Sequence, residues 1–326
     1  WDGFINYGSD INKSEIHAKL NNINVNDTAS LIYTSGTTGN PKGVELTHAN
    51  WSFEVSRSQE ILEFNQGEKY VSWLPLAHVF GQLVDNHSWI KDALHLHVVD
   101  SPLSIVDYAK EVKPHLFIGV PRIYEKIYSN LKSVIDSKTV IKVGLKIPFV
   151  SSIFKGLLKN AVGFSNTRFA GTGAAPINPE ILKLFLSLDI PLYEGYGMTE
   201  NTAIATTNYE GNNKIGTVGK AIKETEIKIA DDGEILIHGK HVMKGYYNNP
   251  VATNETVIHE WLHTGSLYTL IPDRLITLRF ILGAIDDLIE FYSSYNRMNL
   301  IPTESGLNIN KGSSGWFDDN YINFKY

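Results

Sequence analysis

Residues 33–43 combine the residue types that bind phosphate groups. They include three glycines, four serine or threonine side chains and one lysine. Glycine lets backbone N–H groups turn toward an anion, hydroxyls add donors, and lysine adds a mobile positive charge. We predict a cradle for nucleotide phosphates formed by Thr34, Ser35, Gly36, Thr37, Thr38, Gly39 and Lys42.

The setting of this segment supports the same prediction. Apolar or small residues at positions 29–32 predict a buried strand before it, and Thr47 predicts the N-cap of a helix after it. The common P-loop needs Gly-Lys-Ser/Thr after a fixed spacer, whereas here Pro41 precedes Lys42 and Gly43 follows it. The alternative is a glycine-rich surface turn without a ligand.

Two later segments have the pattern of strands that end in ligand-binding turns. Residues 169–176 predict a strand followed by small residues, and residues 190–193 predict the next strand. In open α/β sheets, ligands bind beyond the carboxyl ends of the strands. Small residues would let a flat aromatic ligand lie against the backbone at Gly173, Ala174, Ala175 and Pro176.

The second strand end carries three side chains suited to a nucleotide. Tyr196 offers a ring for the base, Thr199 a hydroxyl for phosphate, and Glu200 a carboxylate for Mg²⁺. Taken alone, Glu200 would be an ordinary surface acid. We therefore assign the second part of the nucleotide site to Glu194, Gly195, Tyr196 and Gly197, followed by Thr199 and Glu200.

The composition of the chain excludes several classes of protein. Its 326 residues are 43% hydrophobic and 20% charged, as in globular proteins of one large or two unequal domains. A net charge of −6 argues against nucleic-acid binding. No cysteine and no apolar run near the ~18 residues of a membrane span fit a cytoplasmic protein. The start has neither a signal-peptide pattern nor a Met, so we expect it to lie inside a longer protein.

The order of predicted elements indicates the fold class. Strands alternate with helices along residues 28–210, which predicts an α/β core with a mostly parallel sheet flanked by helices. Short strands and turns after residue 210 predict a β-rich subdomain. We divide the chain into an N-terminal flank (1–27), the α/β core (28–210), the β-rich subdomain (211–282) and a C-terminal tail (283–326).

Two other features allow more than one interpretation. Residues 138–159 contain five lysines, no acidic residue and many apolar side chains. They predict either a helix pair packed on the core, with its lysines in water, or a basic amphipathic patch on an anionic membrane surface. His95 and His97 would share one face of a strand, as a metal pair or as ordinary strand histidines.

The order of the motifs resembles the adenylate-forming enzymes, which include acyl-CoA synthetases, luciferases and the adenylation domains of peptide synthetases. The resemblance covers about residues 28–265: the phosphate segment, then residues 74–81 with His78, then 173–176, 196–200, 233–235, 243–247 and 261–265. Residues 74–80 and 119–128 are most similar to long-chain fatty acyl-CoA synthetases.

This resemblance implies the large ATP-binding domain of that family and a long-chain fatty acid–CoA ligase. A fatty carboxylate attacks the α-phosphorus of ATP, giving acyl-AMP and pyrophosphate, and the thiol of CoA then displaces AMP. Positioning, Mg²⁺ and fixed donors stabilise the charge on the phosphates. The implied partners are a fatty acid, ATP, Mg²⁺ and CoA, and the implied catalytic residues are Lys42, His78, Thr199 and Glu200.

The chain departs from the family pattern near its C-terminal end. Ser266 replaces an aspartate that binds both ribose hydroxyls, and Ala284 replaces a hinge arginine. Loss of a hydrogen bond to a charged acceptor costs about 1.5–3 kcal/mol, so we expect roughly ten- to a hundred-fold weaker nucleotide binding at the Ser266 side. The resemblance identifies residues 283–326 as a degenerate remnant of the family's hinge and lid with a tail. The family's full lid and its lysine have no counterpart here, so we expect an impaired ligase.

Two alternative functions therefore stay open. One is an acyl-AMP ligase that uses another acceptor, and the other is a non-catalytic nucleotide- or acyl-binding remnant.

Overall fold

The computed structural model describes the side chains of residues 12–34 and 41–265, and its backbone continues through residues 266–271 and 275–278. The chain divides into two compact units, Trp1–Ile285 and Asp286–Tyr326. The second unit lies outside the described residues. The domain boundaries at residues 27, 210 and 282 stay predictions.

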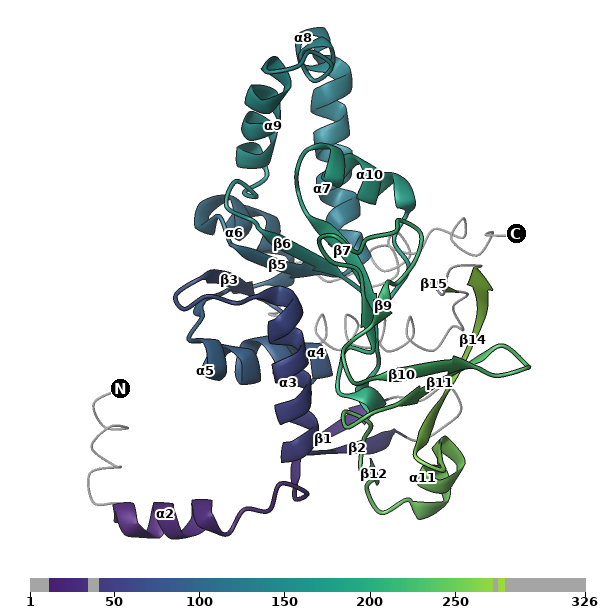
Figure 1. The fold of residues 1–326 in the computed structure, drawn as a ribbon. Helices are drawn as coiled ribbons and strands as arrows, with labels where there is room; N and C mark the ends of the chain where they lie inside the picture. Colours follow the sequence, from purple (N-terminus) through teal and green to yellow (C-terminus); the bar gives the residue numbers. More distant parts are fainter. Residues whose placement is uncertain (1–11, 35–40, 272–274, 279–326) are drawn as a thin grey trace, which may run out of the picture. The chain divides into compact units, whose positions relative to one another are not determined.

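The largest sheet of the first unit has seven strands in the order β4-β3-β5-β6-β7-β8-β9 (Figure 1). Strands β4 to β7 pair in parallel, and β8 and β9 continue the sheet antiparallel. The predicted α/β class with a mostly parallel sheet is confirmed. The strands are β3 (Lys69–Ser72), β4 (His95–Val98), β5 (Leu116–Gly119), β6 (Phe169–Thr172), β7 (Leu192–Tyr196), β8 (Thr206–Thr207) and β9 (Lys220–Ala221).

Helices cover both faces of this sheet because its central strands are apolar on both faces. In β5, Leu116 and Ile118 join one buried cluster and Phe117 joins the other, as alternation along a strand requires. The cluster around Phe117 includes residues of α6, α7, α9 and α10, and the cluster around Leu116 includes residues of α3. The helices are α3 (His48–Leu62), α6 (Ile105–Val112), α7 (Pro121–Ser137), α8 (Thr139–Gly144), α9 (Val150–Ala161) and α10 (Pro179–Ser187).

The predicted phosphate segment joins two antiparallel strands instead of a strand and a helix. Strand β1 (Thr28–Thr34) pairs with β2 (Lys42–Thr47), and β12 (Gly245–Tyr246) pairs with the other edge of β2. Residues 42–47 form a strand because both of its edges find partners, one of them about 200 residues away in the chain.

The details of this region test two expectations. The prediction of a strand at residues 29–32 is confirmed, but the prediction that this strand is buried is wrong. Ile32 is the only buried residue of β1. The expected cap is confirmed: helix α3 begins after Thr47, whose side chain accepts a hydrogen bond from the Asn50 backbone N–H. Residues 35–40 lie outside the described residues.

The region after residue 210 is rich in β-structure, as expected. Its main sheet has the order β10-β11-β14-β13, and β15 pairs with β14. A turn at residues 231–233 connects β10 to β11, where Gly233 adopts a φ of 89°. The elements are β10 (Glu226–Ile229), β11 (Glu234–His238), α11 (Pro250–Thr256), β13 (Val257–Ile258), β14 (Trp261–Ile271) and β15 (Leu275–Leu278).

Short helices complete the described elements. They are α2 (Lys13–Asn21), α4 (Val79–Gly81), the π-helix η1 (Gln82–Ser88), α5 (Trp89–Asp92), and the 3-10 helices η2 (Pro102–Ser104) and η3 (Thr199–Asn201). Across the ranges described above, none of the helices could span a membrane.

The two histidines of β4 lie together on one strand face. Their rings stack, with the centroids of His95 and His97 4.5 Å apart. The described residues contain no group of three or more His, Asp and Glu side chains that could hold a metal ion. A metal pair at this position has no third protein ligand in that part of the chain.

Candidate nucleotide site

The predicted phosphate lysine and the predicted metal ligand contact the same tyrosine. The Nζ atom of Lys42 lies 4.9 Å from the centroid of the Tyr246 ring, and the Tyr246 hydroxyl donates a 2.9 Å hydrogen bond to the Glu200 carboxylate. Glu200 and Tyr246 are both buried. Three segments from residues 42, 200 and 246 therefore meet at one point.

Backbone pairing fixes each member of this cluster. Lys42 begins β2 opposite Thr34, and Tyr246 lies on β12 opposite Val44. Glu200 belongs to η3, and its carbonyl accepts a 2.8 Å hydrogen bond from the Met243 N–H, three residues before Tyr246. The cluster is thus held by main-chain contacts as well as by side chains.

Burial keeps the phenol of Tyr246 protonated, so that it donates a hydrogen bond. Desolvation, and then the neighbouring Glu200 carboxylate, raise the pKa of the Tyr246 phenol well above its usual value. A protonated phenol donates to the carboxylate, while its ring offers a negative face to the Lys42 ammonium. The cluster therefore presents a fixed cation and a fixed carboxylate near each other.

The chemistry of this cluster suits a metal–phosphate complex. Mg²⁺ is usually bound by one or two carboxylates together with substrate phosphates and water, not by an all-protein cage. Glu200 supplies one carboxylate. Among the described residues, no group of three or more His, Asp and Glu side chains could hold a metal ion without a nucleotide. The residues fit Mg²⁺ that arrives with a nucleotide, with Lys42 available to a phosphate.

The second part of the predicted site lies at the ends of the parallel strands β6 and β7. Thr172 pairs with Glu194, so the turns that follow these strands are neighbours. A cavity of about 200 Å³ lies there, and its lining includes Pro176, Glu194 and Thr217. Pro176 of the predicted turn and the predicted strand-end residue Glu194 therefore line one cavity.

Close backbone approach requires glycine at Gly197 and leaves little room for a side chain at Gly173. A Cβ atom on Gly197 would lie 1.7 Å from the Ala203 carbonyl oxygen, and one on Gly173 would lie 3.2 Å from the Gly195 carbonyl oxygen. Ala174 adopts a φ of 65°, an uncommon conformation for a residue with a side chain. Tyr196 ends β7 and packs against a buried apolar cluster that includes Ala205.

Glu194 is a buried acid in this second part of the site. Its carboxylate accepts a 3.2 Å hydrogen bond from the Ile177 N–H. Burial raises its pKa to about 7, and the hydrogen bond only partly opposes that effect. Residues 194–200 run from Glu194, which lines the cavity, to Glu200 of the lysine–tyrosine–glutamate cluster. One continuous segment therefore joins the cavity to the cluster.

His78 occupies a different turn, at the start of α4. Its Nδ1 atom accepts a 3.2 Å hydrogen bond from the Phe80 N–H, and burial lowers its pKa. A neutral imidazole that accepts at Nδ1 carries its proton on Nε2 and can donate there. Gly81 is required behind it, because a Cβ atom would lie 2.3 Å from the Pro75 carbonyl oxygen.

The remaining predicted residues are only partly described. Ser35, Gly36, Thr37, Thr38 and Gly39 lie outside the described residues, as does Ala284. Ser266 lies on strand β14, and its side chain lies outside the described side chains.

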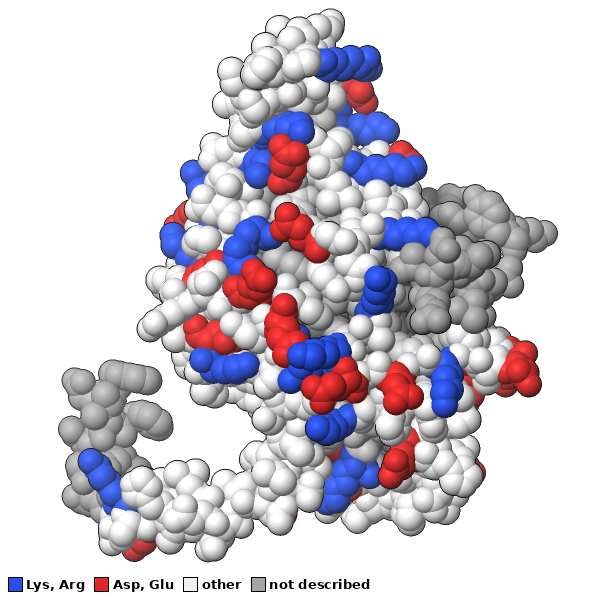
Figure 2. Space-filling model, viewed as in Figure 1, with Lys and Arg blue, Asp and Glu red and all other residues white. Residues whose placement is uncertain are grey.

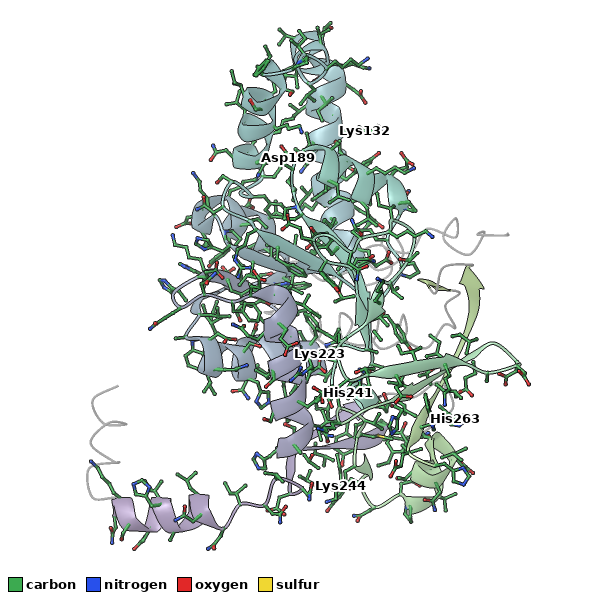
Figure 3. The ribbon with its side chains drawn as sticks, in the orientation of Figure 1. Lys132, Asp189, Lys223, His241, Lys244 and His263 are labelled. Atoms are coloured by element: carbon green, nitrogen blue, oxygen red, sulfur yellow. The ribbon has the colours of Figure 1, made fainter. Side chains whose placement is uncertain are left out.

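Sequence reasoning gave no role to two residues that organise the site. Tyr246 stood in a matched motif at residues 243–247, which was the available signal. Glu234 accepts a 2.8 Å hydrogen bond from the Gly265 N–H and lies 2.9 Å from Nδ1 of His263 (Figure 3). It therefore holds strand β14 at the residue before Ser266.

A larger cavity of about 590 Å³ lies in the β-rich region. Its lining includes Glu224, His238, Lys240 and Met243. None of the residues predicted for the nucleotide site lines it, so we do not assign the nucleotide to it.

The buried hydroxyl of Tyr246 should stabilise the fold. We expect Tyr246→Phe to lower the free energy of unfolding by about 1.5–3 kcal/mol, because a hydrogen bond to a charged group is lost. The neighbouring Tyr247, which is half exposed, provides the control: Tyr247→Phe should change stability by less than about 0.5 kcal/mol. Urea unfolding measures both, and equal losses would contradict the role of the Tyr246 hydroxyl.

Glu194 should make stability depend on pH. Its folded pKa of about 7 exceeds the usual 4.5, so the folded state prefers the protonated acid and stability falls as pH rises through this interval. The loss should be on the order of 3 kcal/mol in total. Glu194→Gln cannot ionise and should flatten this part of the profile.

Thermal unfolding between pH 5 and pH 8 measures how the stability of the parent and of Glu194→Gln changes with pH. Burial also raises the pKa of Asp85, to about 6, so the parent alone would not isolate one group. Parallel profiles for parent and Glu194→Gln would contradict the prediction.

Known proteins show which family shares these features. The sequence profile described as AMP-binding enzyme matches residues 6–247 of the chain. A putative fatty-acid–CoA ligase, fadD11, of Mycobacterium tuberculosis is 32% identical over 276 residues, covering 76% of this chain and 48% of the relative. The long-chain-fatty-acid–CoA ligase ACSBG2 of Gallus gallus is 34% identical over 328 residues, covering 89% of this chain and 42% of the relative. The chain thus spans about half the length of the curated relatives it matches.

Solved structures share the fold. The O-succinylbenzoate coenzyme A synthetase of Bacillus subtilis, in complex with AMP, has a TM-score of 0.61 and 24% identity, covering 78% of this chain and 50% of its own. A malonyl-CoA ligase has a TM-score of 0.62 and 22% identity, covering 78% of this chain and 53% of its own. The family match extends over more than half of the chain and includes the lysine, tyrosine and glutamate of the cluster. The chain belongs to the AMP-binding enzyme family.

Proposed function

We propose that this chain carries the nucleotide site of an AMP-forming acid–thiol ligase that activates long-chain fatty acids. The observation that carries the proposal is the meeting of Lys42, Tyr246 and Glu200 beside the strand-end turns. It supplies a cation for phosphate and a carboxylate for a metal at one place. Relatives named as long-chain fatty-acid–CoA ligases support the choice of acid.

In the proposed site, Lys42 and the hydroxyl groups near it bind the β- and γ-phosphates. Glu200 would hold Mg²⁺ beside the phosphates, and the ion would supply positive charge there. Thr199 contacts the α-phosphate, and the Tyr196 ring lies against adenine. The adenine and ribose lie by the turns with Glu194 and with Gly173, Ala174, Ala175 and Pro176.

The proposed reaction has two displacements. A carboxylate oxygen of the fatty acid forms a bond to the α-phosphorus, and the bond from that phosphorus to the pyrophosphate oxygen breaks. The thiolate of CoA then attacks the acyl carbon, and AMP leaves with the oxygen it shared. The residues of the chain position charges and donors, and none of them becomes a covalent intermediate.

His78 has the geometry to orient the acid substrate. Its Nδ1 atom is occupied by the Phe80 N–H, which leaves the Nε2 proton for an acceptor such as a carboxylate oxygen. Because burial lowers the pKa of His78, its ring stays neutral near pH 7 and can donate the Nε2 proton to the substrate carboxylate. We propose this orienting role for His78.

The acceptor and the cellular setting are also proposals. CoA is the proposed acceptor, because relatives are named CoA ligases. We propose a cytoplasmic protein that touches the anionic membrane surface through residues 138–159, where fatty acids partition.

Ser266 favours one other function. It stands where the resemblance implies a ribose-binding aspartate, which favours a nucleotide-binding protein without ligase activity. Mass-spectrometric assays of the 326-residue chain with palmitate, ATP and Mg²⁺, run with CoA and separately with a carrier protein as acceptor, separate these functions. Acyl-AMP and acyl-CoA above the background without protein support the ligase, and acyl-AMP that reaches only a carrier-protein thiol supports another acceptor. ATP binding without pyrophosphate release would overturn the proposed activity.

Lys42 should discriminate between ATP and AMP. We expect Lys42→Gln to weaken ATP binding about ten- to a hundred-fold, and AMP binding by less than about two-fold, because AMP lacks the β- and γ-phosphates. Lys244, which contacts Thr28 and Glu45 close to the same strands, provides the control Lys244→Gln (Figure 3). Isothermal titration with both nucleotides gives the ratio, and equal losses for ATP and AMP would refute the assignment.

Glu200 should make ATP binding depend on magnesium. Replacing it by glutamine removes the charge and keeps the size, so the increase in ATP affinity on adding Mg²⁺ should shrink about ten-fold or more. Glu45→Gln, on neighbouring strand β2, should leave the Mg²⁺ effect unchanged. ATP titrations with Mg²⁺ and with EDTA measure it, and circular dichroism confirms that the variants are folded.

A further inference from the structure

Helices α8 and α9 form a hairpin whose inner side is tightly packed. Gly144 of α8 lies against the Phe154 ring, so that a Cβ atom there would come within 2.1 Å of it. Ile141 and Leu145 pack against the core, and Leu158 is the only buried residue of α9. The predicted helix pair is therefore confirmed, and its inner contacts leave its other side uncovered.

The outer side of this hairpin is apolar and exposed to solvent. Phe149, at the start of α9, is 92% exposed, and its φ of 67° is one that a phenylalanine rarely adopts. Five more apolar side chains along the hairpin are between 44% and 69% exposed: Val140, Val143, Ile147, Ile153 and Leu157. A contiguous run of exposed apolar side chains usually marks a binding surface.

Lysines accompany this apolar surface. Lys138 and Lys146 are exposed and form no ion pair within the described part of the chain. Lys155 and Lys159 both contact Asp189 at the base of α9, with a 2.9 Å ion pair and a 3.1 Å bond to the backbone carbonyl (Figure 3). Lys142 of α8 forms a 3.5 Å ion pair with Asp136 near the end of α7, so within the described part of the chain the unpaired positive charge at the α8 end is that of Lys138 and Lys146.

The α8 end of the hairpin lies far from the sheet. Helix α7 starts directly after β5 and has 17 residues, which gives it a length of roughly 25 Å, and α8 follows its far end. Figure 1 shows α8 beyond the end of α7, and Figure 2 shows uncharged atoms over the α8 end with basic and acidic side chains beside them. A flat surface could therefore reach this end before it met the sheet.

We propose that the α8–α9 hairpin docks on an anionic lipid bilayer, with Phe149 and its apolar neighbours in the interface and the lysines among the headgroups. Apolar insertion plus attraction between lysine and anionic lipid is how peripheral elements bind membranes. Charge complementarity selects lipid over a second copy of this chain, whose net charge is only −6 and whose hairpin is itself basic. This deepens the membrane contact proposed above but does not depend on ligase activity.

The test is co-sedimentation of the 326-residue chain with two kinds of vesicle, phosphatidylcholine alone and phosphatidylcholine with phosphatidylserine. We expect binding to the anionic vesicles that weakens with added salt. Phe149→Gly should lower partitioning about ten-fold. Lys138→Gln and Lys146→Gln should each lower it about five-fold.

Matched controls separate insertion from general effects. Leu103→Ala removes an exposed apolar side chain from η2, and Lys223→Gln removes an exposed lysine from the β-rich region; both variants should bind like the parent. Glycine adopts a positive φ freely, so Phe149→Gly should fold at least as well as the parent in thermal unfolding.

Two outcomes would overturn the inference. The first is that parent and hairpin variants partition equally, or that none binds anionic vesicles. The second is that sedimentation shows a dimer that Phe149→Gly dissociates, which would assign this face to a second copy of the chain. Neither outcome depends on nucleotide binding. The proposed ligase activity can therefore be refuted without refuting the membrane contact, and the membrane contact without refuting the ligase activity.

Discussion

The contact of Glu200 with Tyr246, and of Tyr246 with Lys42, is the constraint on which the candidate site depends. A buried carboxylate needs donors, because water cannot reach it, and the phenol supplies one at 2.9 Å. The same ring faces the ammonium of the phosphate segment. One tyrosine therefore sets the distance between a cation and an anion that a metal–nucleotide complex would need in fixed positions.

Buried polar groups of α3 hold the segments on either side of this cluster. The Asn50 side chain donates to the carbonyls of Lys240 and Val242, and Glu54 accepts from the Ile204 N–H at 3.1 Å. Burial raises the pKa of Glu54 and lowers that of His241 to about 4, so both side chains stay neutral inside the protein. Helix α3 thus holds the chain segments next to Tyr246 and Glu200 through side chains that carry no charge.

The parallel sheet and the α8–α9 hairpin have different proposed roles. Strands β6 and β7 place two small-residue turns side by side, where backbones approach so closely that Gly197 cannot carry a side chain. Helix α7 instead leads away from the sheet to a hairpin with an apolar outer side. In this proposal, a rigid site binds the nucleotide while a separate surface meets the lipid.

The sequence alone determined the local chemistry: the glycine and hydroxyl spacing at 33–43, the small turn at 173–176, the acid at Glu200 and the alternation that makes a mostly parallel sheet. These follow from residue type and spacing within a few positions. Tertiary structure decided the rest. Residues 42–47 became a strand because β12, distant in sequence, pairs with it, and Tyr246 acquired its role because burial joined it to Glu200. Pairing between remote segments and the burial it produces depend on how the whole chain packs, which a local pattern does not encode.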